Sequence, residues 1–360
     1  MRIKTERTWL DFILKEWLLF ASCTGLIFTS LYFRHLPSWS ISELEVLFIL
    51  FTLFVVVKGL ENSGLILKVS QGIEEGKFIP LKLVVTTFFL SMVVTNDIAL
   101  IVMVPLTLML RTKRKDVIII LEALSANAGS SLMPFGNPQN LFIYWYYGIK
   151  PEKFIITIAP FSLLFLILFV LISLAIKTDT GQKISRIMVK ISFTSYIYGI
   201  LFVIVILTAL RVLPIAAGFL VIIYAFIFDR KSLRIDYALL FCFFCFFGLA
   251  TNMKILLSST LESSRHVFLF SAISSQFMSN VPATLLFAKF TTQWRALLWG
   301  VNVGGFGNLV GSLANLIAYK LYITHKETNN NGLFTIKFLI FGYAMFLLGI
   351  GLYWVIEASL

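Results

Sequence analysis

The sequence predicts an all-α polytopic membrane protein built from inverted repeats, each with a re-entrant hairpin and a broken helix. Three observations support this fold class. Apolar runs of 15 to 23 residues recur along the 360-residue chain, whose mean hydropathy is +0.91 and whose charged residues make up only 13%. The basic residues are unevenly distributed between these runs, and three sequence patterns occur twice. A membrane span needs about 20 apolar residues, and a helix in lipid satisfies its own backbone hydrogen bonds.

The apolar runs predict about nine full spans plus two hairpins. Two of the nine, at 116–147 and 296–320, are long enough to cross but are interrupted by Gly, Pro or Asn. The other seven are uninterrupted and lie near 17–33, 44–66, 154–176, 196–211, 214–228, 237–257 and 334–356. The first run ends in YFRHLPSWS without a small-residue cleavage site, which favours a retained span over a signal peptide.

Two further regions, 78–110 and 266–290, are predicted to be re-entrant hairpins. The first has apolar arms of 16 and 13 residues around Thr95-Asn96-Asp97, and the second has arms of 15 and 9 residues around Ser279-Asn280-Val281. At about 1.5 Å per residue these arms reach roughly 14 to 24 Å, which is less than the roughly 30 Å of the hydrocarbon core. Each hairpin is therefore expected to place its polar tip inside the protein.

The basic residues predict the orientation. If both hairpins return to the side they entered, 22 of the 30 Lys and Arg residues fall on the side of the N-terminus. These 22 lie in the segments 1–16, 58–82, 111–115, 177–190, 229–236 and 320–337. Because cytoplasmic loops carry the excess of basic residues, we expect a cytoplasmic N-terminus and an external C-terminus in a plasma (inner) membrane protein. The same rule accounts for the net charge of +12, so membrane lipid is expected as a partner and nucleic acid is not.

The chain contains three patterns in two copies, in the same order. FVVVKGLENSGLI (54–66) resembles FCFFGLATNMKIL (244–256), and VTNDIAL (94–100) resembles MSNVPAT (278–284). NAGSSLMPFGNPQNLFI (127–143) resembles NVGGFGNLVGSLANLIA (302–318). In the predicted topology the two copies start on opposite sides of the membrane, which is typical of secondary transporters. The predicted units are a first repeat at 1–195, a linking span at 196–213 and a second, inverted repeat at 214–360.

The interruptions predict a binding site. A break in a helix exposes backbone groups that cost several kcal/mol each in lipid, so it persists only where protein, water or an ion supplies partners. Helix N-termini bind anions, whereas unwound carbonyls with Asn and Ser oxygens bind hard cations. Sodium is expected at Asn96, Asp97 and Gly136 in one half and at Ser279, Asn280 and Gly311 in the other. The full candidate site is Thr95, Asn96, Asp97, Asn127, Gly129, Gly136, Asn137, Pro138, Asn140, Ser279, Asn280, Asn302, Gly304, Gly311, Ser312 and Asn315.

These patches resemble the ion transporter superfamily, which includes divalent-anion and citrate symporters, arsenite permeases and certain sodium/proton antiporters. Dicarboxylate members carry Ser-Asn-Thr at each hairpin tip and a Gly-Thr-Pro-Pro-Asn-like motif in each broken helix. The matching residues are Thr95-Asn96-Asp97, Gly136-Asn137-Pro138-Gln139-Asn140, Ser279-Asn280-Val281 and Gly311-Ser312-Leu313-Ala314-Asn315. The resemblance covers most of residues 44–356. It implies an elevator-like motion of both hairpins and broken helices against a scaffold, often in a homodimer.

Asp97 departs from the dicarboxylate pattern, because an acid stands where that subgroup has a hydroxyl. An acidic tip is closer to the arsenite-permease and antiporter branches. A carboxylate inside the membrane suggests ion or proton coupling, although Asp97 could instead, or also, cap the second hairpin helix. Glu122 has two interpretations as well: it titrates during transport, or it pairs with a basic residue such as Lys115.

The leading functional hypothesis is a secondary active permease for a small inorganic or organic anion, coupled to sodium or protons. The alternative is a sodium/proton antiporter that uses Asp97. An enzyme is not expected, because the spans contain no HExxH motif, no paired catalytic aspartates and no Ser/His constellation. No cofactor is expected beyond the coupling ion. Cys23, Cys242 and Cys245 lie in apolar runs and are interpreted as packing residues.

Overall fold

The computed structural model describes residues 17–65, 68, 78–109, 114–176, 193–256, 263–325, 328 and 330–359. Within these residues the chain is all-helical, with fifteen α-helices, one short 3-10 helix and no strand, as the sequence predicts. The elements are α2 (Trp17–Phe33), α3 (Ile41–Asn62), α5 (Ile79–Val94), α6 (Asn96–Met109), α7 (Lys115–Ser130), α8 (Pro138–Tyr146), α9 (Pro151–Ala175), α10 (Thr194–Ala209), η1 (Ile215–Gly218), α11 (Phe219–Phe228), α12 (Tyr237–Leu256), α13 (Ser264–Met278), α14 (Asn280–Ala288), α15 (Trp294–Gly304), α16 (Leu313–Thr324) and α17 (Asn331–Ser359).

The helix boundaries follow local capping chemistry. α3 begins at Ile41, three residues before the predicted start, because Ser40 and Glu43 form a capping box. The backbone N–H of Ser40 donates to Glu43 Oε2 at 2.7 Å, and the N–H of Glu43 donates to Ser40 Oγ at 3.4 Å. α9 begins at Pro151, a residue that favours the first turn of a helix. The predicted segments 1–16 and 177–190, and the predicted ends at 66, 110 and 257, lie outside the described residues.

Three of the described helices are long and apolar enough to cross a membrane on that basis alone. They are α9, α12 and α17. α3 has 22 residues but carries Glu43, Glu45, Lys58 and Glu61, whereas α2 and α10 are apolar but have 17 and 16 residues. Several of the predicted full spans therefore correspond to helices that would need flanking residues to cross the hydrocarbon core of a membrane.

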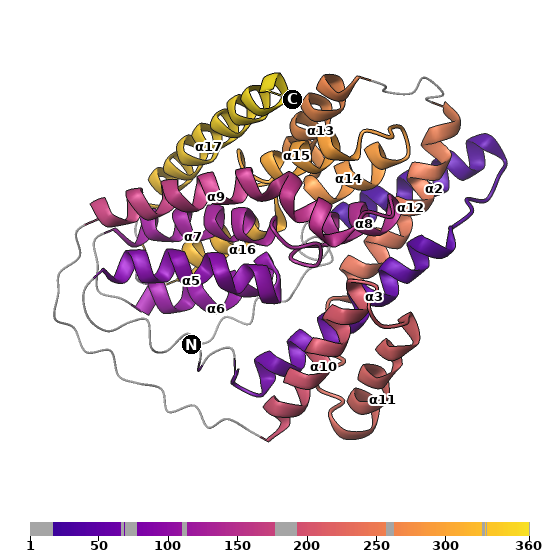
Figure 1. The fold of residues 1–360 in the computed structure, drawn as a ribbon, viewed down its shortest axis with the longest axis horizontal. Helices are drawn as coiled ribbons and strands as arrows, with labels where there is room; N and C mark the ends of the chain where they lie inside the picture. The colour runs from indigo at the N-terminus through magenta and orange to yellow at the C-terminus, as the bar shows by residue number, and fades with distance from the viewer. Residues whose placement is uncertain are drawn as a thin grey trace, which may run out of the picture.

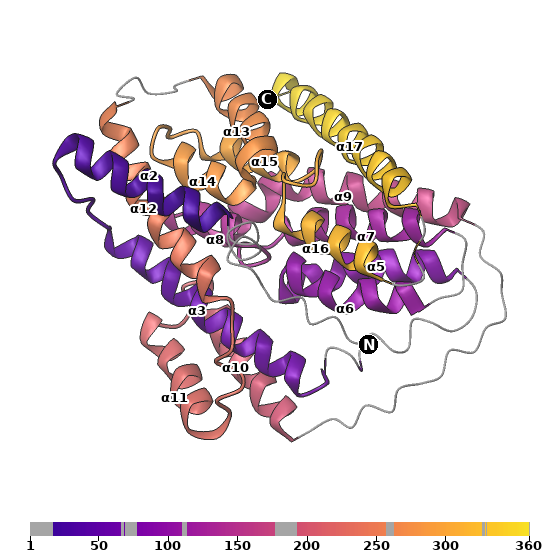
Figure 2. The same cartoon turned by 180° about the vertical axis from the view of Figure 1, so that it is seen from behind.

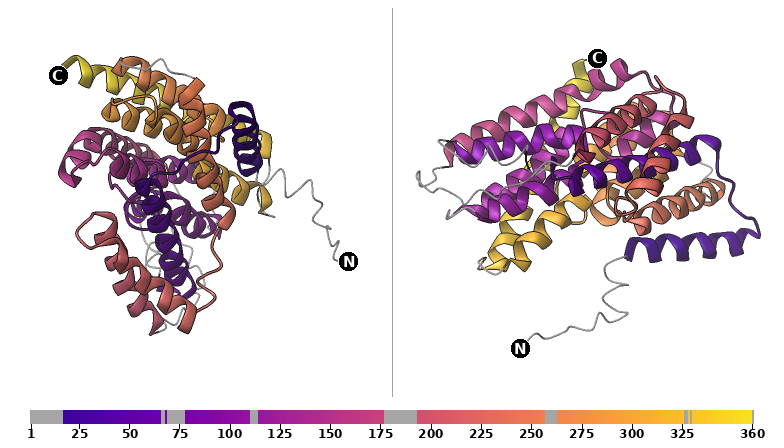
Figure 3. Two further views of the ribbon diagram at one scale, coloured as in Figure 1. Left: turned by 90° about the vertical axis from the view of Figure 1, so that its right-hand side faces the viewer. Right: turned by 90° about the horizontal axis from the view of Figure 1, so that it is seen from below.

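The helices form two groups that lie on opposite sides of the molecule (Figures 1 and 2). The α3 group consists of α2, α3, α10, η1, α11 and α12, in which α2 packs on α12 and α3 packs on α10, α11 and α12. The α7 group consists of α5–α9 and α13–α17. The two groups meet mainly where α3 contacts α8 and α12 contacts α14. The end of α17 lies at the edge of the α7 group in every view (Figure 3).

Two pairs of consecutive helices are joined by a single residue with a left-handed backbone. Thr95 separates α5 from α6 with φ of 80°, and Ser279 separates α13 from α14 with φ of 73°. Few residues other than glycine adopt positive φ, so these two junctions are specific local structures. They fall at the two polar tips predicted from the sequence. The helices of each pair pack against one another.

Both predicted broken helices are interrupted in the structure. α7 ends at Ser130 and α8 begins at Pro138, while α15 ends at Gly304 and α16 begins at Leu313. The new helices begin with N-cap residues: Asn137 Oδ1 accepts from the N–H of Asn140 at 2.9 Å, and Ser312 Oγ accepts from the N–H of Ala314 at 3.3 Å. A side-chain cap therefore stabilises the start of the second helix after each break.

Packing within the α7 group is arranged in corresponding pairs. α5 packs on α7, and α13 packs on α15; α7 packs on α9, and α15 packs on α17. Across the group, α8 packs on α14 and α16 packs on α6. The break after α15 is anchored by Phe306, which is fully buried and stacks on Phe161 with ring centroids 5.4 Å apart. Phe165, at 4.7 Å, completes this aromatic contact with α9.

Candidate functional site

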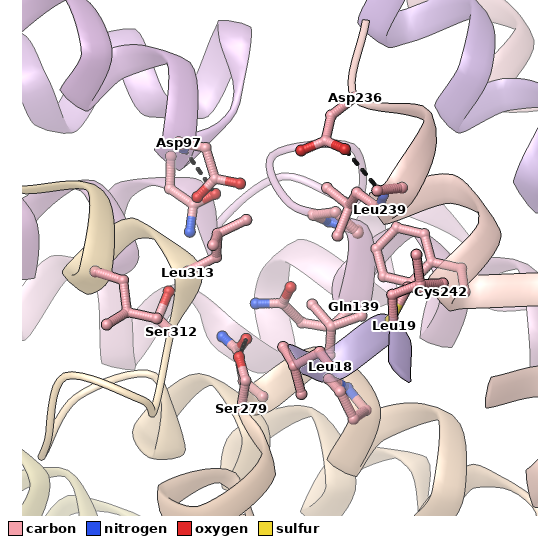
Figure 4. A pocket seen from close by; sticks show the side chains of 18 of the residues that line it. Leu18, Leu19, Asp97, Gln139, Asp236, Leu239, Cys242, Ser279, Ser312 and Leu313 are labelled. Atoms are coloured by element: carbon pink, nitrogen blue, oxygen red, sulfur yellow. Dashed lines mark hydrogen bonds between the residues drawn. The ribbon is translucent and has the colours of Figure 1, made fainter. Parts of the chain in front are cut away.

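A cavity of about 230 Å³, lined by apolar and polar side chains, lies between the two helix groups. Four helices of the α7 group, namely α6, α8, α14 and α16, reach it with their N-terminal ends. The α3 group contributes the beginnings of α2 and α12. Figure 4 shows Asp97, Ser279 and Asp236 reaching this cavity from three different elements. Its lining includes six predicted site residues, Asn96, Asp97, Pro138, Ser279, Asn280 and Ser312.

Asp97 lies in the first turn of α6, and its carboxylate has a distinctive environment. Its backbone N–H donates to Asn96 Oδ1 at 3.0 Å. Its own Oδ1 is buried and accepts no hydrogen bond from the described residues. A buried carboxylate oxygen without a hydrogen-bond partner is energetically costly. The backbone contact expected if Asp97 Oδ1 caps α6 is not observed.

Asparagines from the two broken helices pair with one another across the α7 group. Asn127 Nδ2 of α7 donates to Asn315 Oδ1 of α16 at 2.8 Å. In the corresponding contact, Asn302 Nδ2 of α15 donates to Asn140 Oδ1 of α8 at 2.9 Å. All four side chains are at most 5% exposed. The two regions that resemble one another in sequence therefore contact each other at equivalent positions.

The helix junctions are bonded to the breaks. Asn96 Nδ2, next to Thr95, donates to Asn127 Oδ1 at 3.1 Å, and Ser312 Oγ donates to the same oxygen at 2.9 Å. On the other side, the N–H of Asn280 donates to the carbonyl of Gly311 at 3.0 Å. The candidate site is thus one continuous polar network and not four separate patches.

The remaining predicted residues lie behind the cavity and shape it. Asn137 Nδ2 donates to Ser130 Oγ at 3.2 Å across the first break. A methyl group on Gly136 would lie 2.1 Å from the Ser130 carbonyl oxygen, so only glycine permits this close approach. Gly129 and Gly304 occupy helix–helix contacts, and Gly311 lies against the Gly304 carbonyl. Thr95 is 3% exposed and forms the α5–α6 junction.

Three polar residues line the cavity that were not among the predicted site residues: Gln139, Asp236 and Lys320. Gln139 belongs to the GNPQN motif, so the sequence offered a signal for it. Asp236 and Lys320 fall in segments interpreted as cytoplasmic, and nothing in the sequence shows that these segments approach the breaks. Asp236 also caps α12, because its Oδ1 accepts from the N–H of Leu239 at 3.0 Å.

Glu122 lies away from the cavity. It is fully buried in α7, and its Oε1 accepts from Thr107 Oγ1 of α6 at 2.7 Å. Lys115, the partner considered from the sequence, instead donates from Nζ to the carbonyl of Leu108 at 2.7 Å. Glu122 therefore joins α7 to α6 through its hydrogen bond with Thr107.

The two predicted sodium positions differ in how well the residues assemble. Ser279, Asn280 and Gly311 are mutually close, with Ser279 Oγ 3.4 Å from Asn280 Oδ1. In the other predicted position Asn96 and Asp97 are adjacent, but the close contact of Gly136 is with Ser130 and not with either of them. The described part of the chain holds no group of three His, Cys, Asp or Glu residues placed to bind a metal ion. The donors at the two predicted positions are neutral oxygens and the single carboxylate of Asp97.

Fold and cavity together define an all-helical integral membrane protein, in which interrupted helices converge on this cavity. Residues 18–299 match the citrate transporter family. The chain belongs to this family, within the ion transporter superfamily, and it is a membrane transporter.

Three proteins with similar sequences illustrate the relationship. An uncharacterized transporter of Methanocaldococcus jannaschii is 34% identical over 304 residues, which cover 80% of this chain and 82% of the relative. The inner membrane protein YbiR of Escherichia coli K12 is 33% identical over 296 residues, covering 75% and 77%. The silicon efflux transporter LSI3 of rice, Oryza sativa subsp. japonica, is 33% identical over 128 residues, covering 33% and 26%.

Proposed function

We propose that this chain is a secondary active permease that moves a small inorganic or organic anion, coupled to sodium or protons. The observation that carries the proposal is the convergence of α6, α8, α14 and α16, which all begin at one cavity between the helix groups. The N-terminal end of a helix carries a partial positive charge from the helix dipole, and it therefore favours an anion. Four such ends provide attraction without requiring many basic side chains.

The charges of the cavity bear on the substrate class. The lining contains the carboxylates of Asp97 and Asp236 and the ammonium group of Lys320. Two carboxylates repel a multiply charged anion such as citrate, even in a family named after citrate. A small anion of low charge fits this lining better.

Inverted repeats with re-entrant hairpins are the architecture that we propose for this transport. The matching helix pairs in the α7 group and the paired asparagines support two repeats. α6 and α14 have 14 and 9 residues, or roughly 21 and 13 Å, which is too short to cross about 30 Å of hydrocarbon. Because α6 and α14 are this short, we propose that each returns the chain to the side of the membrane from which its partner helix, α5 or α13, entered.

The movement that we propose is elevator-like, with the α7 group as the moving unit and the α3 group as the scaffold. The cavity lies at the boundary between these groups, where relative movement would change its access. The N-terminus would be cytoplasmic and the C-terminus external, in the inner membrane, which is the location in the name of the YbiR relative. A homodimer built through the scaffold is part of this proposal.

A sodium/proton antiporter is the second candidate function. Asp97 favours it, because its buried Oδ1 accepts no hydrogen bond from the described residues and can exchange a proton for a cation. In that case the cavity would serve ions only, and no anion would cross.

Proteoliposome transport distinguishes the two functions. Purified protein is tested against a panel of small anions of one, two and three charges, with a sodium gradient, a proton gradient or neither. Gradient-dependent uptake of a singly charged anion is the expected result. Sodium-driven proton movement in the absence of every anion would establish the antiporter instead.

A further inference from the structure

The cavity and a set of polar contacts lie at opposite ends of α8 and α14. Pro138 and Gln139 at the start of α8, and Asn280 at the start of α14, line the cavity. Each helix has nine residues and is therefore roughly 13 Å long. At their C-terminal ends both helices make charged contacts with the α3 group, and those contacts close this side of the boundary.

The first contact is a buried ion pair between α3 and the end of α14. Lys289 Nζ lies 2.5 Å from Glu43 Oε1, and the two side chains are 11% and 0% exposed. Glu43 is held in place from its other oxygen by the capping box with Ser40. The ammonium group also lies over the ring of Tyr146, 5.6 Å from its centroid. Removing one member of such a pair leaves the other charge buried and unpaired, so the two residues are retained or lost together where α14 meets α3.

The second contact is a reciprocal clamp between the ends of α8 and α10. Arg211 Nη2 donates to the carbonyls of Tyr144 and Trp145 at 3.1 and 2.9 Å. In return, Tyr144 Oη donates to the carbonyl of Leu210 at 3.2 Å, and Trp145 Nε1 donates to that of Ala209 at 2.9 Å. The guanidinium lies 4.9 and 4.6 Å from the two rings. A cation that binds the final carbonyls of α8 is favoured there by the helix dipole.

We propose that the Glu43–Lys289 pair and the Arg211 clamp form an outer gate, which keeps this protein in a conformation whose cavity opens to the cytoplasm. This inference rests on the proposed transport function and its orientation. The exposed residues of the cavity lining, Trp17, Asp236 and Lys320, adjoin segments predicted to be cytoplasmic. The gate residues Arg211 and Lys289 fall in segments predicted to be external.

The gate biases an equilibrium and does not bind the substrate. Every gate contact joins the α3 group to the α7 group, so movement of one group against the other breaks them together. An interaction that exists in only one conformation shifts the population toward that conformation by its own free energy. Weakening the gate should therefore lower the fraction of molecules whose cavity faces the cytoplasm.

A native thiol reports which side the cavity faces. Cys242 lines the cavity, and Cys23 and Cys245 are replaced by serine so that labelling reports one position. A membrane-impermeant methanethiosulfonate reagent is applied to everted and to right-side-out vesicles. Cys242 is 5% exposed, so the comparison is one of relative rates: the unmodified gate should give faster labelling in everted vesicles, where the cytoplasmic face is exposed, than in right-side-out vesicles.

The gate is then weakened with the double variant Glu43→Gln and Lys289→Met, which leaves no buried charge unpaired. Because the gate stabilises the conformation that predominates, the rare outward-facing conformation gives the sensitive readout. We expect the labelling rate in right-side-out vesicles to rise about tenfold, which corresponds to about 1.4 kcal/mol, with little change in everted vesicles. Lys58→Met is the matched control, because it breaks a pair on the same helix whose side chains are each 33% exposed. Trp145→Phe, which removes one gate hydrogen bond, should give a smaller increase and serves if the double variant fails to fold.

The outcomes separate the gate from the proposed function. No rise in the right-side-out labelling rate of correctly folded gate variants, or labelling of the unmodified protein that is faster from the external side, would overturn the gate. If the gate variants gain external labelling as expected but the unmodified protein takes up no anion, the gate stands and the proposed anion transport fails. If the unmodified protein takes up an anion but the gate variants label as it does, the transport function stands and the gate fails.

Discussion

Two carboxylates in one cavity have different surroundings. Asp236 Oδ1 accepts from the N–H of Leu239 and so stabilises the start of α12. Asp97 Oδ1 is buried and accepts no hydrogen bond from the described residues. A hydrogen bond already occupies Asp236 Oδ1, whereas Asp97 Oδ1 has none among the described residues. Because a charged group binds its partner more strongly than a neutral one, Asp97 Oδ1 is the better candidate ligand for a coupling ion. We therefore propose a structural role for Asp236 and a coupling role for Asp97.

The substitution Asp97→Asn tests the coupling role. Asparagine keeps the shape of the side chain but binds neither a proton nor a cation with a full charge. A contact with a charged group contributes about 1.5–3 kcal/mol, so we expect gradient-driven transport to fall at least about tenfold. Transport is measured in proteoliposomes with limiting coupling ion. Asp236→Asn, which retains an oxygen for Leu239, is the control and should remain coupled; near-normal coupled transport by Asp97→Asn would refute its role.

At the scale of elements, the breaks depend on short helices that are capped and cross-linked. α8 and α16 begin at Asn137 and Ser312, whose side chains accept from the first turn. Asn127 and Asn302 then connect each broken helix to its counterpart. These bonds supply the partners that an interrupted helix needs at membrane depth.

The two asparagines should differ in their contribution to stability. In Asn127→Ala four buried groups lose a bond, on Asn96, Gly305, Ser312 and Asn315. In Asn302→Ala only two do, Asn140 Oδ1 and the carbonyl of Leu298. Each buried group without its partner costs about 1–3 kcal/mol, so Asn127→Ala should lower the apparent Tm by more than Asn302→Ala. Thermal unfolding in detergent measures this, and equal Tm values would contradict the network.

The first break should not tolerate a side chain at Gly136. A methyl group there would lie 2.1 Å from the Ser130 carbonyl, so the backbone between α7 and α8 must shift. Overpacking costs about 1–3 kcal/mol, and the displaced cavity wall should reduce transport as well. Gly199→Ala in α10 is the control, since nothing lies within 4 Å of its new methyl group. That control should be neutral or stabilising by about 0.5–1 kcal/mol; full activity of Gly136→Ala would show that the break is more adaptable than its contacts indicate.

At the scale of the whole molecule, the arrangement of the two groups gives the protein a polarity across the membrane. The cavity lies at one end of α8 and α14, and charged contacts lie at the other. The uneven distribution of Lys and Arg leads us to propose that the cavity end faces the cytoplasm. The transport direction of any substrate depends on the gradient and not on this orientation.

Epitope tags on the two termini test the orientation directly. In right-side-out vesicles we expect a protease to remove a C-terminal tag and to leave an N-terminal tag intact, with the reverse in everted vesicles. The reason is the excess of basic residues in the segments on the N-terminal side. Removal of both tags from the same face would mean that an odd number of crossings has been assigned incorrectly.

Much of the helix pattern was predictable because its determinants are local. Apolar length fixes where a helix can lie in lipid, and Gly, Pro and Asn fix where it stops. The breaks at 131–137 and 305–312 and the junctions at Thr95 and Ser279 fall within the patterns that the sequence repeats. α3 begins three residues before the start that apolar length predicts, because Ser40 and Glu43 form a capping box ahead of the apolar run.

An all-helical membrane protein, the positions of its interruptions and most of the polar residues near the cavity could thus be predicted from the order of residues alone. The folded arrangement was needed to show that Asp236 and Lys320 join that cavity, that Asn127 pairs with Asn315, and that Lys289 binds Glu43. Distance along the chain accounts for this division. Caps and breaks depend on neighbours within one helical turn, whereas these contacts join residues more than a hundred positions apart, or place a helix end in a cavity formed by other helices.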